Sequence, residues 1–461
     1  MMKSPVFRSL TLASVGFAAL CGALTSCSPD QVNVLSTVPD SAPVVMTFDA
    51  ERFMAPAGLR LDGNTLTAEA SIARSPFDLA PLGAETYRGL LESVDGAHMV
   101  FFVSTGRVPY LSFIVTDTGK FTSLMEQYGD PQSAQGFKTW DAPDGLKITL
   151  RGNQGWISRD PQAAASLKAV LDRAAEQSVM QSIGVANALQ DNNNLFNFEL
   201  NTGGEYRYVA QGNEESGALG VDVRAMKPDG ELMTLSQTQT LSEDFLRYAG
   251  PETAIAAAVG LRPEFTSSVN WNAVANTLEN MTGIGASPIS IVAPLLADVD
   301  GTVSVALGPV SEEAWDEPSL ANWNVTVMAH MPQHKIVDAL NTFRSYFALG
   351  GLKVTTDART GMMTVPFYGS TLHVGPVDGY LAISNTPMTG RDENSLTTVF
   401  NGKQGALYAA LPPLDFVPGM QKGMTVSMQL ETDRLHVKLS PVDESSPVLG
   451  SLMGMFITLT F

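Results

Sequence analysis

Residues 90–96 read LLESVDG and residues 295–301 read LLADVDG, so the same residue stands at five of seven positions. A strand-like apolar run follows each copy, HMVFFVS at 98–104 and TVSVAL at 302–307. Similarity between two parts of one chain is the sequence pattern of an internal repeat. The pair therefore predicts a fold built from two similar units.

Neighbouring matches keep the same order on both sides of this stretch. Upstream, PDSA at 39–42 pairs with PETA at 251–254, and each opens an apolar run. Downstream, YLSFIV at 110–115 and NVTVMA at 324–329 have the alternation and the β-branched content of strands. The consistent order favours a repeat over a chance match.

A helix is predicted after each of these downstream strands. Apolar residues at helical spacing lie within 121–128, with Gly129 as a stop, and again within 336–347, with Pro332 in the first turn. Another helix is predicted after 160, where Asp160 has the character of an N-cap and a proline follows it. Strands and helices therefore mix in both halves.

The predicted fold class is α+β, with two homologous units that are each a curved, mainly antiparallel sheet with packed helices. The units are placed at 38–241 and 248–443, because the matched segments fall within these bounds. Few stretches have the length of a βαβ alternation, which argues against a doubly wound sheet. Residues 444–461 are predicted to be a final strand that packs on the second unit. Each unit should end in a hairpin, made by 219–226 with 231–235 and by 424–430 with 434–439.

The composition is that of an acidic folded protein. Of 461 residues, 44% are hydrophobic and 16% are charged, and the net charge is −19. This apolar content supports a large core and argues against disorder. Residues 1–26 hold two positive charges, Lys3 and Arg8, so the remainder carries −21. We expect no nucleic-acid partner, because such a surface repels phosphates.

The beginning of the chain has the pattern of an export signal. Lys3 and Arg8 precede an apolar run at 10–24 of about 15 residues, shorter than the roughly 20 that span a bilayer. The run ends in Leu24-Thr25-Ser26-Cys27. This arrangement resembles a bacterial lipoprotein signal peptide, here residues 1–26, in which the cysteine is lipidated after cleavage.

The resemblance implies a membrane anchor on Cys27. A diacylglycerol and a further acyl chain together give lasting attachment, since one chain alone binds only marginally. Ser28 stands where an aspartate would favour the inner membrane, which implies the outer membrane of a Gram-negative cell, in either leaflet. Residues 27–37 would be the lipid anchor and tether. Cys21 lies inside the leader, so we expect no disulfide.

With VPDSA at 38–42 and the repeated arrangement, the chain is similar to large Gram-negative envelope lipoproteins of unknown function. That resemblance implies no catalytic or binding residues. The motifs of common enzymes, a nucleophile elbow, a phosphate loop and a dinucleotide fingerprint, do not occur.

Two polar patterns resemble metal sites but lack features that such sites require. His330 and His334 have the spacing of a helical zinc pair, but Pro332 lies between them, and His330 is expected to end a strand. The DVDG sequence at 298–301 lacks the glutamate of a calcium loop and is better explained as a turn. We predict no metal and no cofactor.

Trp315 and Trp323 are the candidates for an exposed contact, because they lie in a loop rich in proline and acidic residues. The predicted function is a membrane-anchored binding or scaffold module without catalysis, with an envelope protein, a glycan or a lipid as partner. Two alternatives stay open. One is a periplasmic carrier or chaperone for lipid or apolar ligands, which 20 methionines would suit. The other is a hydrolase with an unrecognised site.

Overall fold

The computed structural model describes residues 34–50, 52, 59–62, 65–68, 89, 92–215, 217–250, 252–274, 293–316, 319, 321–367, 369–391, 395–413 and 423–442. Two compact units divide the chain. Unit 1 comprises residues 1–233, 412–424 and 438–461, and unit 2 comprises 234–411 and 425–437. Cys27 and the segment 444–461 lie outside the described residues.

The prediction of two homologous units, each with a sheet of its own, is wrong. The described strands, apart from a separate β2–β3 ribbon, all belong to one 20-stranded sheet. The pairings given by register are antiparallel, so the protein is richer in β-structure than the predicted α+β class. Local patterns identified several of the strands, but strand pairing over long distances in the chain decides how many sheets they form.

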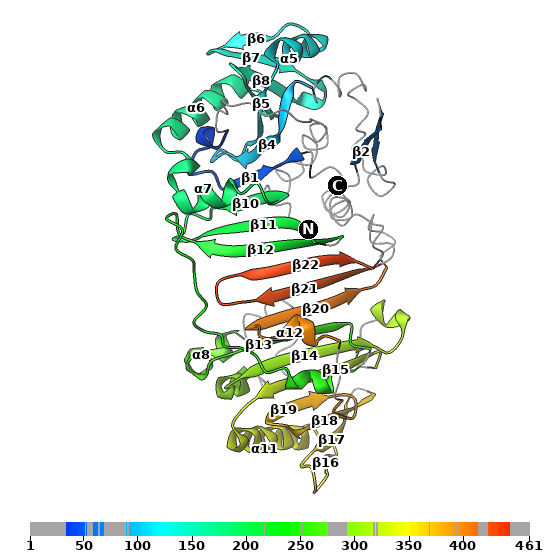
Figure 1. Ribbon diagram of the computed structural model, residues 1–461. Coiled ribbons are helices and arrows are strands. Elements are labelled where there is room, and N and C mark those ends of the chain that lie inside the picture. The colour runs from blue at the N-terminus through cyan, green and yellow to red at the C-terminus, as the bar shows by residue number, and fades with distance from the viewer. Residues whose placement is uncertain are drawn as a thin grey trace. The chain divides into compact units, whose positions relative to one another are not determined.

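Unit 1 holds a run of strands that pair in the order β12–β11–β10–β1–β4–β5–β9–β8–β7–β6 (Figure 1). The strands are β1 (Val44–Phe48), β4 (Val94–Val103), β5 (Pro109–Val115), β6 (Gln132–Ala134), β7 (Phe137–Asp141), β8 (Lys147–Arg151), β9 (Gln154–Ser158), β10 (Phe196–Leu200), β11 (Arg207–Glu215) and β12 (Ala218–Met226). The β2–β3 ribbon joins Leu59–Asp62 to Thr65–Ala68.

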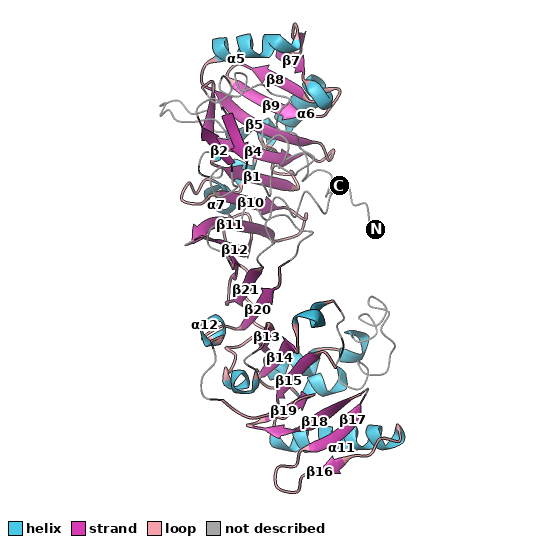
Figure 2. Cartoon of the chain, turned by 90° about the vertical axis from the view of Figure 1, so that its right-hand side faces the viewer, coloured by secondary structure: helices cyan, strands magenta, loops and turns pink. Residues whose placement is uncertain are grey.

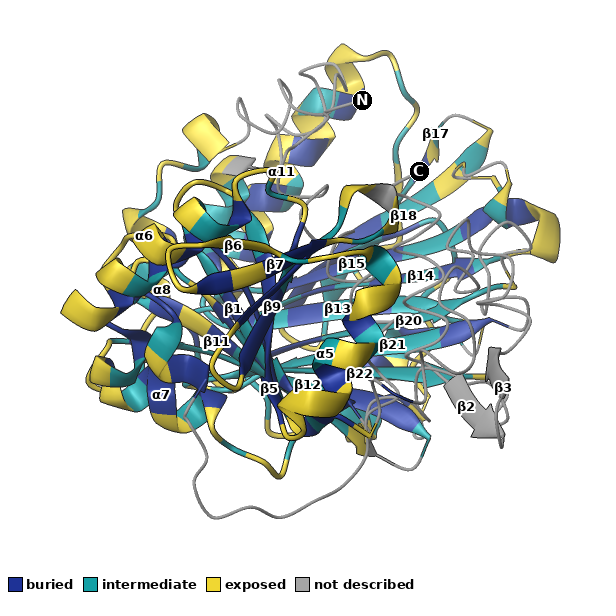
Figure 3. Cartoon of the chain, turned by 90° about the horizontal axis from the view of Figure 1, so that it is seen from above, coloured by how far each residue is buried: buried dark blue, intermediate teal, exposed yellow. Residues whose placement is uncertain are grey.

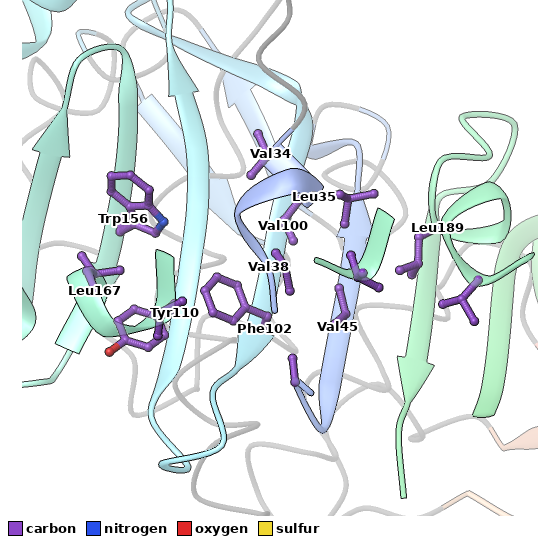
Figure 4. Packing of buried hydrophobic residues seen from close by; sticks show 14 of the residues in the cluster. Val34, Leu35, Val38, Val45, Val100, Phe102, Tyr110, Trp156, Leu167 and Leu189 are labelled. Carbon is purple, nitrogen blue, oxygen red and sulfur yellow. The ribbon is translucent and has the colours of Figure 1, made fainter. Parts of the chain in front are cut away.

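Helices cover one face of these strands. They are the 3-10 helices η1 (Val34–Thr37) and η4 (Val179–Gln181) and the α-helices α6 (Ala163–Glu176) and α7 (Ile183–Leu189). α6 buries Leu167 and Val170 and exposes its other side (Figure 3). Figure 4 shows how η1 inserts Val34, Leu35 and its neighbour Val38 among apolar side chains of β1 and β4. Part of the segment expected as a tether is therefore core.

A second core lies on the opposite face of unit 1. α5 (Thr118–Met125), which η2 (Glu126–Tyr128) follows, places Phe121 and Met125 on the strands, where Phe121 meets the Trp140 ring edge to face. The predicted helix within 121–128 is confirmed, and Gly129 ends it at φ 93°. Asp160 differs from its prediction. Its carboxylate accepts a bond from the Gln162 amide, and α6 begins later, at Ala163.

Unit 2 holds strands that pair in the order β20–β13–β14–β15–β19–β18–β17–β16. The strands are β13 (Ile255–Gly260), β14 (Thr302–Pro309), β15 (Trp323–His330), β16 (Thr355–Thr356), β17 (Met363–Phe367), β18 (Ser370–Val377), β19 (Tyr380–Ser384) and β20 (Gly405–Leu411). β21 (Met424–Leu430) and β22 (Leu435–Pro441) contain residues of both units.

The long helix of unit 2 is α11 (Gln333–Leu349), which lies along β18 and β19 (Figure 2). It buries Ile336, Phe343 and Phe347, as its periodicity predicts, and Pro332 is its N-cap. Shorter helices are η5 (Asp244–Tyr248), α8 (Pro263–Ser268), η6 (Ala293–Asp298), η7 (Glu312–Trp315) and α12 (Thr397–Phe400), and η3 (Pro143–Gly145) lies in unit 1.

Of the two predicted hairpins, the one at 424–430 and 434–439 corresponds to β21 and β22. The other pairs differently. β12 forms its hairpin with β11, before it in the chain, and 231–235 contributes only an isolated bridge from Met226 to Leu232. No described helix is long and apolar enough to cross a membrane.

Candidate functional site

A pocket of about 390 Å³ opens in unit 1 where η1, β1, β4 and the loop after α7 meet. Its volume lies within the range of small-ligand sites, roughly 300–1,000 Å³. Apolar side chains form much of its wall, and polar residues of β1, β4 and the loop after α7 stand among them. The lining residues are Val34, Leu35, Thr47, Phe48, Asp49, Asp95, Ala97, His98, Met99, Val100, Ile114, Leu189, Gln190, Asp191, Asn192, Asn194 and Asn197.

An ion pair on β4 contributes the titratable groups of this pocket. His98 Nδ1 lies 3.1 Å from Asp95 Oδ2, and the Ala97 amide donates to Asp95 Oδ1. The hydrogen bond to Asp95 raises the pKa of His98, although burial acts in the other direction. Burial would raise the pKa of Asp95, but His98 and the Ala97 amide lower it overall. The pair therefore favours a protonated histidine next to an ionised aspartate.

The loop after α7 is fixed by hydrogen bonds to side chains. Asn197 on β10 donates to the carbonyls of Leu189 and Asp191, at 3.2 and 3.0 Å, and to Thr47 Oγ1 at 3.1 Å. The guanidinium of Arg52 donates to the carbonyls of Asn192, Asn193 and Asn194. Because side chains hydrogen-bond these backbone carbonyls, the loop after α7 is held in place, and this part of the pocket wall is preorganised.

A buried charge cluster lies next to the pocket along β10. Arg207 donates through Nη1 and Nη2 to the carboxylate of Asp40, at 2.9 and 2.6 Å, and through Nη1 to Glu199 Oε1 at 2.9 Å. The side chain of Glu199 is 1% exposed, and its Oε2 has no hydrogen-bond partner among the described residues. Burial raises the pKa of Glu199 to about 7, against the opposing effect of Arg207.

The two tryptophans predicted as an exposed contact lie together in unit 2. Their rings meet edge to face at 4.8 Å, and Trp323 Nε1 donates to the Ala314 carbonyl. Trp323 is 8% exposed and Trp315 is half-buried. Trp323, the first residue of β15, is therefore buried, and of the two tryptophans only Trp315 is accessible enough to contact a partner.

The two histidines with the spacing of a zinc pair lie on different elements. His330 ends β15, as predicted, and His334 lies in α11. His330 Nδ1 lies 2.7 Å from Asp300 Oδ1, so the second aspartate of the DVDG sequence at 298–301 connects this turn to the end of β15. Within the described ranges, no group of three potential ligands is placed to hold a metal ion.

Sequence reasoning missed both the pocket and the charge cluster. Asp95 lies in the repeated stretch at 90–96 and His98 begins the predicted strand at 98–104, so neither pattern indicates an ion pair. The chain has 47 acidic residues, so proximity in the sequence cannot single out Glu199 or Asp40. The alternation of 196–200, in which Asn197 and Glu199 face the helices, is the signal that could have identified buried polar groups.

Comparison with known proteins places the chain in no family. No protein-family model matches it, and no curated protein matches it. A solved structure titled "Structure of crystal form I of TP0453" is similar with a TM-score of 0.28 and 7% identity, over 43% of this chain and 80% of that chain. A likeness at this level carries no argument about fold or function.

Proposed function

We propose that this protein is a membrane-anchored, non-enzymatic binding module of the bacterial cell envelope, and that the pocket of unit 1 is its binding site. Cys27 would carry the lipid that holds it at the outer membrane. The observation that carries the proposal is the preorganised pocket of about 390 Å³ with an apolar wall and polar groups around it. This size suits a small ligand with an apolar part.

The same pocket bears on the two alternatives. A carrier of lipid or apolar ligands would also use an apolar wall, and the test below distinguishes it through the identity of the bound molecule. A hydrolase would need a nucleophile aligned with His98. Thr47, the hydroxyl residue of the lining, directs its Oγ1 to the Leu189 carbonyl at 2.5 Å. This arrangement favours a structural hydroxyl and therefore a binding role.

Binding can be tested by blocking the pocket at Ala97, which lines it and is exposed. Ala97→Trp should fill the pocket without disturbing the core. We expect the neutral fluorescent probe N-phenyl-1-naphthylamine to bind the wild-type protein, and its affinity to fall about tenfold or more in the variant. Fluorescence titration gives both dissociation constants.

The matched control is Ala134→Trp, which adds the same ring at an exposed alanine of β6. It should bind the probe as the wild type does. Native mass spectrometry of the purified protein would identify any retained molecule, and a phospholipid would favour the carrier. Equal probe binding by wild type and Ala97→Trp would contradict the proposed site.

A further inference from the structure

The buried cluster of unit 1 contains two carboxylates and one cation. Asp40 receives two hydrogen bonds from Arg207, one from Ser182 Oγ at 2.7 Å and one from Gln177 Nε2 at 3.2 Å. Glu199 receives one bond, from Arg207. The side chains of Arg207 and Asp40 are 8% and 13% exposed. The cluster is electrically balanced only when one of its carboxyl groups holds a proton.

The cluster joins the start of the described chain to the helices of unit 1. We use the name entry segment for residues 34–43. Its Asp40 amide donates to the Gln177 carbonyl at 3.0 Å, and its Val38 carbonyl accepts from the Val179 amide at 3.0 Å. Both of these partners lie between α6 and α7, close to Ser182. Asp40 is therefore held by backbone and side-chain bonds at the same place.

The entry segment is also part of the pocket. Val34 and Leu35 line the pocket and are buried, and Asn197, another lining residue, lies two positions before Glu199 on the same face of β10. A change in how Asp40 is held therefore acts on a wall of the pocket. Figure 4 shows Val34, Leu35 and Val38 close to Val100 and Val45.

Glu199 is the group of the cluster that can hold the proton. Asp40 already accepts four hydrogen bonds through its carboxylate, whereas Oε2 of Glu199 has no hydrogen-bond partner among the described residues. Arg207 stays charged at all relevant pH values. The charged groups that act on Glu199 are Arg207 from β11 and Asp40 from the entry segment. The helices contribute neutral side chains, those of Ser182 and Gln177.

We propose that Glu199, Arg207 and Asp40 form a proton-dependent latch on the entry segment. With Glu199 protonated, Arg207 neutralises Asp40 and the latch is closed. When Glu199 loses its proton, the cluster carries a net negative charge in a buried place, Arg207 is divided between two carboxylates, and Asp40 is held less firmly. The effect of the latch on ligand binding rests on the function proposed above.

The direction of the pH effect follows from burial. Burial raises the pKa of Glu199 to about 7, whereas an unfolded glutamate has its ordinary value of 4.5. The folded form therefore binds this proton more tightly than the unfolded form does. The stabilising contribution is complete below the unfolded pKa and is lost as pH rises through about 7.

Hydrogen–deuterium exchange of the full chain tests the latch without any ligand. The readout is the protection factor of the Asp40 and Val179 amides, which is the ratio of the intrinsic exchange rate at each pH to the observed rate. In the wild type it should fall about tenfold or more between about pH 5.5 and about pH 8.5. In Glu199→Gln, which mimics the protonated group, it should change less than about twofold.

Glu214→Gln is the matched control, since Glu214 lies on β11 but is exposed, and it should follow the wild type. The latch is overturned if wild-type protection does not fall, or if it falls equally in Glu199→Gln. Should Glu199→Gln not fold, Asp40→Asn decides the question. Arg207 then faces a single carboxylate, so loss of the Glu199 proton leaves a balanced pair rather than a net negative charge, and a fall as large as that of the wild type would overturn the latch.

A second measurement separates the latch from the proposed function. Binding of N-phenyl-1-naphthylamine should weaken between the same two pH values in the wild type and not in Glu199→Gln. If the probe binds at neither pH while the amides respond, the proposed function fails and the latch stands. If the amides respond and the probe binds equally at both, the effect on the pocket is overturned.

Discussion

His98 illustrates how one side chain in the pocket connects pH to stability. Its side chain is 35% exposed, and its partner Asp95 is 13% exposed, so water screens the pair in part. The hydrogen bond to Asp95 raises the pKa of His98 above 6.5. The charged form is therefore favoured in the folded protein, at a position that a ligand would touch.

Replacement of His98 by glutamine should lower stability at low pH only. Because the folded pKa is raised, the contribution of His98 is complete below 6.5 and disappears as pH rises through the folded value. We expect a loss below about 1 kcal/mol at acidic pH, given the exposure of the pair, and a smaller loss at alkaline pH. Urea unfolding at several pH values gives the difference. A loss that grows with rising pH would contradict this account.

At the scale of the element, paired strands in unit 1 place a phenylalanine ring over a glycine. Phe113 on β5 faces Gly155 on β9 in register, and a Cβ built on Gly155 would lie 2.4 Å from the ring. Phe196 on β10 covers Gly212 on β11 in the same way, at 2.1 Å. In both pairs the missing side chain makes room for a ring to lie flat on the neighbouring strand.

Gly155→Ala should therefore destabilise unit 1, because Phe113 is fully buried and cannot move aside freely. We expect a loss of about 1–3 kcal/mol in the free energy of unfolding, the usual cost of overpacking. Gly106→Ala is the control, since its added methyl group would approach only Ser104 Oγ, at 3.7 Å. Chemical denaturation of both variants tests the prediction, and equal stabilities would refute it.

Elements could be predicted wherever one local pattern determined them. The periodicity of 336–347 predicted α11, and Gly129 marked the end of the helix before it. The hairpin of β11 and β12 was missed. The chain turns at Gly217, whose φ is 80°, and RYVAQGNEE at 207–215 has weak apolar alternation. Pro-Asp-Gly at 228–230 lies between the two predicted strands and is a stronger turn signal than one glycine, so the sequence favours the wrong hairpin.

For the whole molecule, the central expectation is attachment through Cys27. Cys27→Ser should release the protein from the membrane fraction, because a serine cannot form the thioether to the lipid. Fractionation of cells with both forms, and intact mass of the purified proteins, would measure this. A control, Ser28→Ala, should stay bound. A wild-type protein without acyl mass on its first mature residue would contradict the anchor.

The arrangement of the whole sheet could not be predicted from the sequence. Repeated motifs at 90–96 and 295–301 indicated where strands and turns lie, but not which strands pair. The register of a strand depends on partners far away in the chain, and periodicity within one segment carries no information about them. The pocket was missed for the same reason, since η1, β4 and β10 meet only after folding.

The two shortest strands have a consequence for how copies of this protein behave in a crowded compartment. β6 has three residues and β16 has two, all of them exposed, and among the described strands each pairs with a single neighbour. An edge strand of a large sheet has unpaired backbone N–H and C=O groups that can pair with a strand of another molecule. Very short edge strands have too few of these groups for such pairing. Proteins with large sheets can otherwise aggregate into fibres through edge-to-edge pairing. The short strands β6 and β16 therefore disfavour such aggregation at high local concentration.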